Sequence, residues 1–164
     1  MESSRPDFLN ILRIFHKHVV DYIIVGGVCA VLHGAPISTF DIDIVHSREP
    51  GNVDRIMKAL DELKARYRDP AGRMIKPTKA HLSSHGHQLL MTKDGPLDLL
   101  GELAKGRGYD ELLENTVSLV LSEGLTVRPL NLETLIQTKE EAARDKDIAI
   151  LAILRRTLEE QRKK

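Results

Sequence analysis

Two aspartates stand one residue apart in the apolar segment Phe40-Asp41-Ile42-Asp43-Ile44. Successive side chains on a β-strand point to opposite faces, so the carboxylates of Asp41 and Asp43 would leave the same face, about 6 to 7 Å apart at the backbone. Because like charges at this distance repel each other, a protein that keeps both acids ionised usually supplies a cation, and hard oxygen ligands suit Mg²⁺. The pair therefore predicts a divalent-metal site for Mg²⁺, with Mn²⁺ as the alternative ion.

Two adjacent glycines precede this pair. Gly26-Gly27 ends the apolar run Val20–Val25, which is rich in β-branched residues and predicts a buried strand followed by a tight turn. Because glycine lacks a Cβ atom, its backbone N–H group can approach an anion closely at the start of a following helix, where the helix dipole favours phosphate. We therefore expect a phosphate-binding segment beside the metal site.

The order of these features resembles a known signature. A Gly-Gly pair, about a dozen residues and then Asp-x-Asp on a strand is similar to the pattern of the nucleotidyltransferase superfamily with the DNA polymerase beta type of fold. Its small bacterial members, which include minimal nucleotidyltransferases and toxins of abortive-infection and toxin–antitoxin systems, are the most similar. The resemblance implies a third carboxylate on a later strand of the same sheet, and Asp98 in Gly-Pro-Leu-Asp-Leu-Leu stands where it is expected.

The C-terminal part carries a second element of the resemblance. Leu132-Glu133-Thr134-Leu135-Ile136 followed by Lys139 is similar to a recurring pattern of the small bacterial enzymes, and Arg144 and Asp147 match the Arg-x-x-Asp that follows it. The resemblance implies that Lys139 points toward the nucleotide phosphates. An ordinary charge on an amphipathic helix is the alternative for Lys139, and more so for the other two.

The function implied is transfer of a nucleoside monophosphate from a nucleoside triphosphate to an acceptor hydroxyl, with release of pyrophosphate. Asp41, Asp43 and Asp98 would be the catalytic and metal-binding residues. The nucleotide would be bound by five residues: Gly26, Gly27, Ser38, Thr39 and Lys139.

The sequence departs from the pattern at one position. Many relatives place an arginine shortly before Thr-x-Asp-x-Asp, where Ile37 stands here. A phosphate or acceptor contact is therefore missing, although the hydroxyls of Ser38 and Thr39 can hydrogen-bond phosphate. The alternative function is a catalytically idle nucleotide-binding partner or antitoxin of the same fold.

Other readings of the acids have less support. A phosphatase of the haloacid dehalogenase type also has Asp-x-Asp after an apolar strand, but the later pair of acids that it needs is not evident. A dinucleotide-binding domain needs Gly-x-Gly-x-x-Gly, and Gly26, Gly27 and Gly34 have a different spacing. His85 and His87 would share a strand face and are alternative metal ligands.

The apolar periodicity predicts an α+β fold, in which a mixed sheet is flanked by α-helices and followed by C-terminal helices. The hairpin around Asp94-Gly95 would put Asp98 on the sheet face opposite its leucine neighbours. If that strand lies beside residues 39–45, Asp98 can meet Asp41 and Asp43. A helix from residue 53, capped by Asn52, would reach about residue 67, and 69–84 would be a basic loop, with a loop that reaches over the site as the minority interpretation. The first expected helix opens at 4–7 and closes at 16–18, and another, capped by Asn131, reaches about residue 144. The other expected elements are helices at 28–32, 109–115 and 146–161, and strands at 20–25, 39–45, 85–92, 96–100, 117–121 and 125–129.

Composition limits the class of protein. The 164 residues predict one domain, 1–164, with a catalytic core at about 20–105 and a C-terminal hairpin and helices at about 106–164. Lys and Arg number 24, as do Asp and Glu, so no global field attracts polyanions and any nucleic-acid contact would be a local patch. The single cysteine, Cys29, excludes an internal disulfide.

Location and partners follow from the same reading. No signal peptide and no apolar run of about 20 residues is evident, so we expect a cytoplasmic protein with no membrane partner. The expected partners are a nucleoside triphosphate and an acceptor, which is left open between a protein hydroxyl, a tRNA end and a small molecule such as an aminoglycoside. A cognate partner protein is a further alternative.

Overall fold

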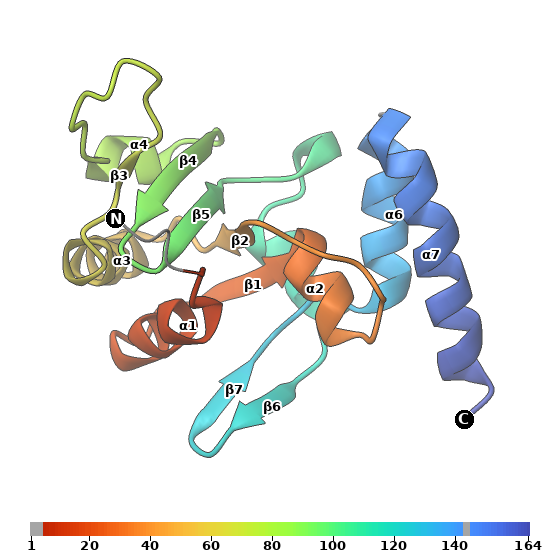
Figure 1. The fold of residues 1–164 in the computed structure, drawn as a ribbon. Helices are drawn as coiled ribbons and strands as arrows, with labels where there is room; N and C mark the ends of the chain where they lie inside the picture. The colour runs from red at the N-terminus through yellow and green to blue at the C-terminus, as the bar shows by residue number, and fades with distance from the viewer. Residues whose placement is uncertain (1–4, 143–144) are drawn as a thin grey trace.

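The computed structural model describes residues 5–142 and 145–164, with only the backbone of 145–147. A five-stranded sheet lies at its centre, in the order β1-β2-β5-β4-β3 (Figure 1). β2 and β5 are parallel, whereas the other neighbouring pairs are antiparallel, so the sheet is mixed as predicted. The strands are β1 (Tyr22–Val25), β2 (Ile42–His46), β3 (Arg66–Tyr67), β4 (His87–Thr92) and β5 (Gly95–Leu100).

Helices cover both faces of this sheet. On one face lie α1 (Phe8–Lys17), α3 (Pro50–Glu62) and α4 (Lys79–Ser83), and on the other lie α2 (Gly26–Leu32), α6 (Leu132–Ala142) and α7 (Asp145–Arg162), as Figure 1 shows. The α+β architecture with C-terminal helices is therefore confirmed. Among the described residues, no helix combines the length and the apolar character that a membrane span requires.

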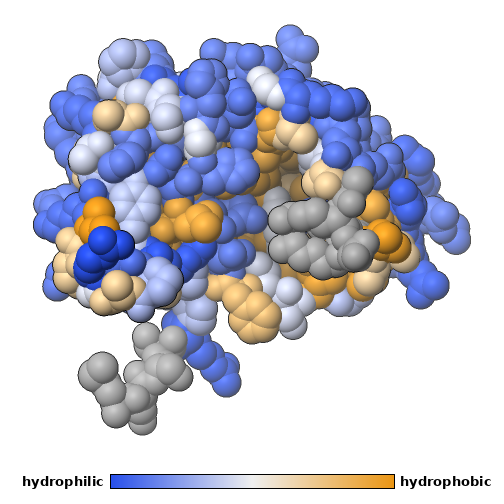
Figure 2. Space-filling view, turned by 90° about the horizontal axis from the view of Figure 1, so that it is seen from above, coloured by the Kyte–Doolittle hydropathy of each residue, from blue (hydrophilic) through white to orange (hydrophobic). Residues whose placement is uncertain are grey.

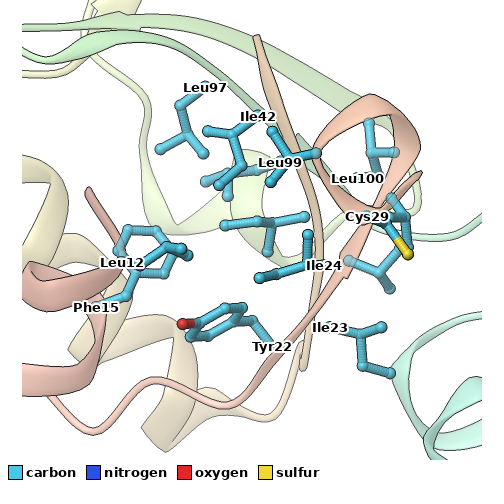
Figure 3. Close-up of a cluster of buried hydrophobic side chains, with 14 of the residues drawn as sticks. Leu12, Phe15, Tyr22, Ile23, Ile24, Cys29, Ile42, Leu97, Leu99 and Leu100 are labelled. Carbon is cyan, nitrogen blue, oxygen red and sulfur yellow. The ribbon is translucent and has the colours of Figure 1, made fainter. Parts of the chain in front are cut away.

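The core forms where the apolar face of the sheet meets α1 and α3. Figure 3 shows strand residues such as Ile24, Ile42 and Leu99 in one cluster with Phe15 of α1. These four side chains are fully buried, and the rings of Phe15 and Tyr22 meet edge to face at 5.5 Å between centroids. Burial of a side chain of this size is worth about 1.5–3 kcal/mol. This packing fixes the central strands, and with them the positions of the side chains on the opposite face of the sheet.

The C-terminal helices are tied to the sheet through β1. A second sheet consists of β6 (Leu119–Ser122) and β7 (Leu125–Val127), which form the predicted hairpin. The chain then runs along β1, where Ile24 N–H donates to the Arg128 carbonyl at 2.9 Å and Leu130 N–H donates to the Ile24 carbonyl at 3.1 Å. Short helical segments precede the hairpin: Ala104–Gly106, α5 (Tyr109–Leu112) and Leu113–Asn115. α6 thereby starts at a fixed position beside β1.

The start of α6 is capped as the sequence indicates. The Thr134 N–H donates to Asn131 Oδ1 at 2.8 Å, which satisfies one of the free N–H groups at the helix start. Residues of this part, such as Leu135 and Leu154, belong to the same buried cluster as the central sheet. The division of the chain near residue 105 stays a prediction.

The strand with the two aspartates is shorter than predicted. β2 begins at Ile42, so Asp41 precedes the strand. Phe40 is 82% exposed and does not share the core face of Ile42 and Ile44, contrary to the predicted alternation from residue 39. The cause is a local turn, since the Thr39 hydroxyl donates to the Asp41 carbonyl at 2.9 Å.

The prediction for residues 52–84 was wrong in three places. α3 begins at Pro50 after Glu49 and ends at Glu62, and β3 follows it. Asn52 is buried inside the helix instead of capping it: its amide donates to the Asp21 and Ser47 carbonyls at 3.0 and 2.8 Å. The segment 69–84 is not all loop, because α4 forms there with Thr78 as its cap.

Candidate functional site

Three carboxylates meet on the sheet face opposite the core. β2 and β5 are parallel neighbours, and their register places Asp43 beside Asp98. Asp41 joins them from the turn before β2. One carboxylate oxygen of each acid lies within 4.8 Å of those of the other two. The structure thus brings together the three acids that the sequence indicated, including Asp98, which lies more than 50 residues further along the chain.

The protein alone leaves this cluster electrostatically unfavourable. The pKa of Asp43 is raised to about 8, first by burial, then by the charge of Asp41 and by Asp98, while Lys139 acts in the opposite direction. Burial and Asp98 also raise the pKa of Asp41. In addition, Asp43 Oδ1 is buried without a hydrogen-bond partner. Clustered hard oxygen ligands with an unsatisfied buried oxygen fit a divalent cation.

Asp98 differs from the other two acids because an arginine balances its charge. Arg68 Nη2 lies 2.8 Å from Asp98 Oδ1, and Arg68 Nη1 donates to the Leu90 carbonyl at 3.2 Å. The pair has the distance of an ion pair but not the angles of a hydrogen bond, so Asp98 Oδ1 also lacks a hydrogen-bond donor. Sequence analysis missed this contact because residues up to 67 were assigned to a helix. The local alternation Arg66-Tyr67-Arg68 is too short to indicate a strand.

The two glycines have a steric reason in the structure. Gly26 has a φ of +69°, and a Cβ atom there would lie 2.3 Å from Asp43 Oδ2. At Gly27 a Cβ atom would lie 2.7 Å from Thr39 Oγ1. α2 begins at Gly26 itself, two residues before the predicted start. Glycine is therefore required because the backbone touches the acid-bearing segment, and this contact brings the start of α2 to the carboxylates.

All eight candidate residues line a single cleft of about 580 Å³. They are Gly26, Gly27, Ser38, Thr39, Asp41, Asp43, Asp98 and Lys139. Ile37 lines the cleft as well, together with apolar residues such as Leu89 of β4 and Leu154 of α7. Figure 2 shows the molecule from above, where apolar side chains (orange) are visible in depressions between hydrophilic ones (blue).

A second hollow of about 630 Å³ adjoins this cleft. The two share Asp43 and Lys139 in their walls, and the second one extends to His85 and Glu102. The metal-ligand alternative for His85 and His87 has no support here, because the cluster of potential ligands found among the described residues consists of the three aspartates. Glu102 holds both histidines instead: its carboxylate pairs with His85 Nδ1 at 2.8 Å, and its carbonyl accepts from His87 Nε2 at 3.2 Å.

Most cations of the basic segment are directed elsewhere. Arg73 pairs with Asp69 and Lys79 pairs with Asp54. The loop between β3 and α4 projects from the body of the protein (Figure 1). The predicted pair Arg144 and Asp147 lies outside the residues whose side chains the structure describes.

Comparisons with known proteins support the architecture. No protein-family model matches the chain, and no curated protein matches its sequence. Several solved structures are similar in shape. TM1012 from Thermotoga maritima, a proposed nucleotidyltransferase, has a TM-score of 0.56 and 20% identity over 97% of both chains.

Two of the other structures are antibiotic-resistance proteins. LnuA, a lincosamide antibiotic adenylyltransferase solved with bound lincomycin, has a TM-score of 0.60 and 13% identity over 90% of this chain and 94% of its own. The antibiotic-resistance factor ANT(2'')-Ia has a TM-score of 0.61 and 15% identity over 92% of this chain and 82% of its own. At these identities the likeness establishes the fold, and the chain has the fold of the nucleotidyltransferases.

Proposed function

We propose that the protein is a metal-dependent nucleotidyltransferase, which moves a nucleoside monophosphate from a nucleoside triphosphate to an acceptor hydroxyl and releases pyrophosphate. The observation that carries this proposal is the convergence of Asp41, Asp43 and Asp98 within 4.8 Å in the wall of a cleft. The fold shared with TM1012, LnuA and ANT(2'')-Ia supports it.

Asp41 and Asp43 would hold the metal, and Asp98 would complete a second metal position beside it, with Mg²⁺ as the expected ion and Mn²⁺ as the alternative. When bound, the ion supplies positive charge that neutralises the triphosphate and the departing pyrophosphate. The same charge would offset the repulsion that raises the pKa of Asp43.

The protein's own residues would position the substrates and move one proton. The acceptor oxygen attacks the α-phosphorus, the bond from that phosphorus to the bridging oxygen breaks, and pyrophosphate leaves. Asp98 accepts the proton of the acceptor hydroxyl. The backbone of Gly26 and Gly27, the hydroxyls of Ser38 and Thr39 and the ammonium group of Lys139 hold the phosphates, since all of them line the same cleft.

A small molecule is the acceptor that the cavities favour. The hollow beside the acids measures about 630 Å³, within the usual range of about 300–1,000 Å³ for small-molecule sites. LnuA was solved with a bound antibiotic, lincomycin. A protein hydroxyl and a tRNA end are the other acceptors to be tested. A role in a toxin–antitoxin pair rests on the sequence resemblance alone.

The proposal is tested by following the label of each α-labelled nucleoside triphosphate in the presence of Mg²⁺ and a cell extract. The wild type should transfer label to an acceptor, whereas the double variant Asp41→Asn, Asp43→Asn should transfer none. Asp61→Asn is a matched control, because Asp61 is an exposed acid of α3 outside the cleft. The mobility of the labelled product identifies the acceptor as protein, RNA or small molecule.

The idle binding protein is the second candidate, and Ile37 favours it. This apolar side chain lines the cleft, at a position where the family resemblance implies an arginine. An idle protein would bind the triphosphate in a metal-dependent manner and release no pyrophosphate. Calorimetry with Mg²⁺ and triphosphate, run beside the label assay, separates the two.

A further inference from the structure

Arg68 is the one arginine of the described chain that forms an ion pair with an acid of the cluster. Its backbone N–H donates to the Leu89 carbonyl at 3.1 Å, which fixes residue 68 at the edge of β4. From there the side chain crosses β4 and brings Nη2 to 2.8 Å from Asp98 Oδ1 on β5. The guanidinium group therefore stands beside the carboxylate cluster and contributes one positive charge to it.

The three acids consequently differ in how much further charge they can bind. Asp98 is only 8% exposed and already has a cation at contact distance. No arginine among the described residues pairs with Asp41 or Asp43, and Asp43 Oδ1 lacks a hydrogen-bond partner. The charge of Arg68 also lowers the pKa of Asp41, and that of Lys139 lowers the pKa of Asp43. A divalent cation beside Asp98 meets the strongest repulsion, because the guanidinium group is in contact with that carboxylate.

We propose that Arg68 takes the place of a second cation. The protein without nucleotide then binds one divalent ion, at Asp41 and Asp43, and the guanidinium group prevents a second ion from binding beside Asp98. This inference rests on the proposed metal site. Arg68 is then a positioning residue: it holds Asp98 in place, and a second ion binds beside Asp98 only after the guanidinium group has moved away.

The surroundings of Arg68 allow such a movement. Its side chain is 29% exposed, and it lines a hollow of about 500 Å³ on the β3 side, together with Arg66 and Met91. Arriving phosphate oxygens compete with Asp98 for the guanidinium group, since the planar fork of arginine matches phosphate as well as carboxylate. Binding of the triphosphate would thereby couple release of Asp98 to the presence of substrate.

The test counts Mn²⁺ ions bound to the metal-free protein without nucleotide, by calorimetry and by electron paramagnetic resonance. We expect one ion per chain for the wild type and two for Arg68→Gln, with the second site at least about tenfold tighter than any second site of the wild type. Arg66→Gln is the matched control: it removes the same charge two residues away, and Arg66 forms no ion pair among the described residues. Arg68→Lys keeps the charge and should return the count to one.

Two bound ions in the wild type, or one in Arg68→Gln, would overturn the inference and leave the proposed transfer reaction intact. If Arg66→Gln gained a second ion as Arg68→Gln does, general charge would be the cause and the specific role of Arg68 would be refuted. Absence of Mn²⁺ binding by every variant would overturn both this inference and the proposed metal site. Should Arg68→Gln not fold, Arg68→Met offers the same readout, because it removes the charge and keeps an extended apolar side chain in place of the arginine stem.

Discussion

Loss of the Asp43 charge should stabilise the metal-free protein, and the effect should depend on pH. The pKa of Asp43 is raised to about 8 in the folded protein, first by burial and then by the charge of Asp41, against about 3.9 for aspartate in an unfolded chain. A carboxyl group with a raised pKa binds its proton more tightly in the folded state. Its contribution to the free energy of unfolding is therefore fully present below about pH 4 and is lost as the pH rises toward 8.

The size of the effect follows from this difference in pKa. At pH 7 the loss approaches about 4 kcal/mol, since each pH unit above the unfolded value contributes about 1.4 kcal/mol. Asp41 and Asp98 share the repulsion, so this figure belongs to the cluster and is an upper limit for Asp43 alone. Recovery of half of it in Asp43→Asn would raise the melting temperature by about 4–8 °C in a chain of this size.

Thermal melts monitored by circular dichroism in the presence of a chelator measure this effect. Asp43→Asn should melt above the wild type at pH 7.5, and the difference should shrink to about a third at pH 5. Mg²⁺ should raise the melting temperature of the wild type and leave that of Asp43→Asn nearly unchanged. Asp61→Asn, on the exposed side of α3, should have the melting temperature of the wild type at each pH, with and without Mg²⁺. A variant Asp43→Asn that melts at or below the wild type at pH 7.5 would refute the reasoning.

Three further substitutions test other parts of the structure. Gly26→Ala should lower the melting temperature and abolish the stabilisation by Mg²⁺, because its φ of +69° costs about 1–2 kcal/mol for alanine and the added methyl group meets Asp43 Oδ2. Asn131→Ala should cost about 1 kcal/mol in urea unfolding through the lost cap of α6. Asn52→Ala should cost about 2–4 kcal/mol in the same assay, because the Asp21 backbone groups and the Ser47 carbonyl lose their partners. For each variant, an unchanged unfolding midpoint would contradict the stabilising role given to the contact that the substitution removes.

The acid cluster was predictable because strand periodicity puts Asp41 and Asp43 on one face, and the family resemblance points to Asp98 as the third acid. Two sequence patterns leave few arrangements that bury the apolar face of each strand. They are Asp-x-Asp within an apolar run and Leu-Asp-Leu after an Asp-Gly turn. The parallel pairing of β2 with β5 then sets Asp43 beside Asp98. Local patterns of this kind determine the centre of the site.

What the sequence did not predict depends on one local side-chain turn and on strand pairing between distant residues. Phe40 follows the strand alternation but is 82% exposed, since a side-chain hydrogen bond of Thr39 turns the chain before β2. β3 has only two residues, too few for a periodic signal, and its position depends on pairing with β4. Arg68 therefore could not be assigned to the site from its neighbours in sequence.

The most direct test of the central claim compares triphosphate labelled at the α-phosphate with triphosphate labelled at the γ-phosphate, in the presence of Mg²⁺ and the acceptor fraction of an extract. A nucleotidyltransferase moves the α-label onto the acceptor and releases the γ-label as pyrophosphate, and Asp41→Asn, Asp43→Asn does neither. Appearance of the γ-label on the acceptor or as inorganic phosphate, or equal transfer by the double variant, would contradict the proposed function.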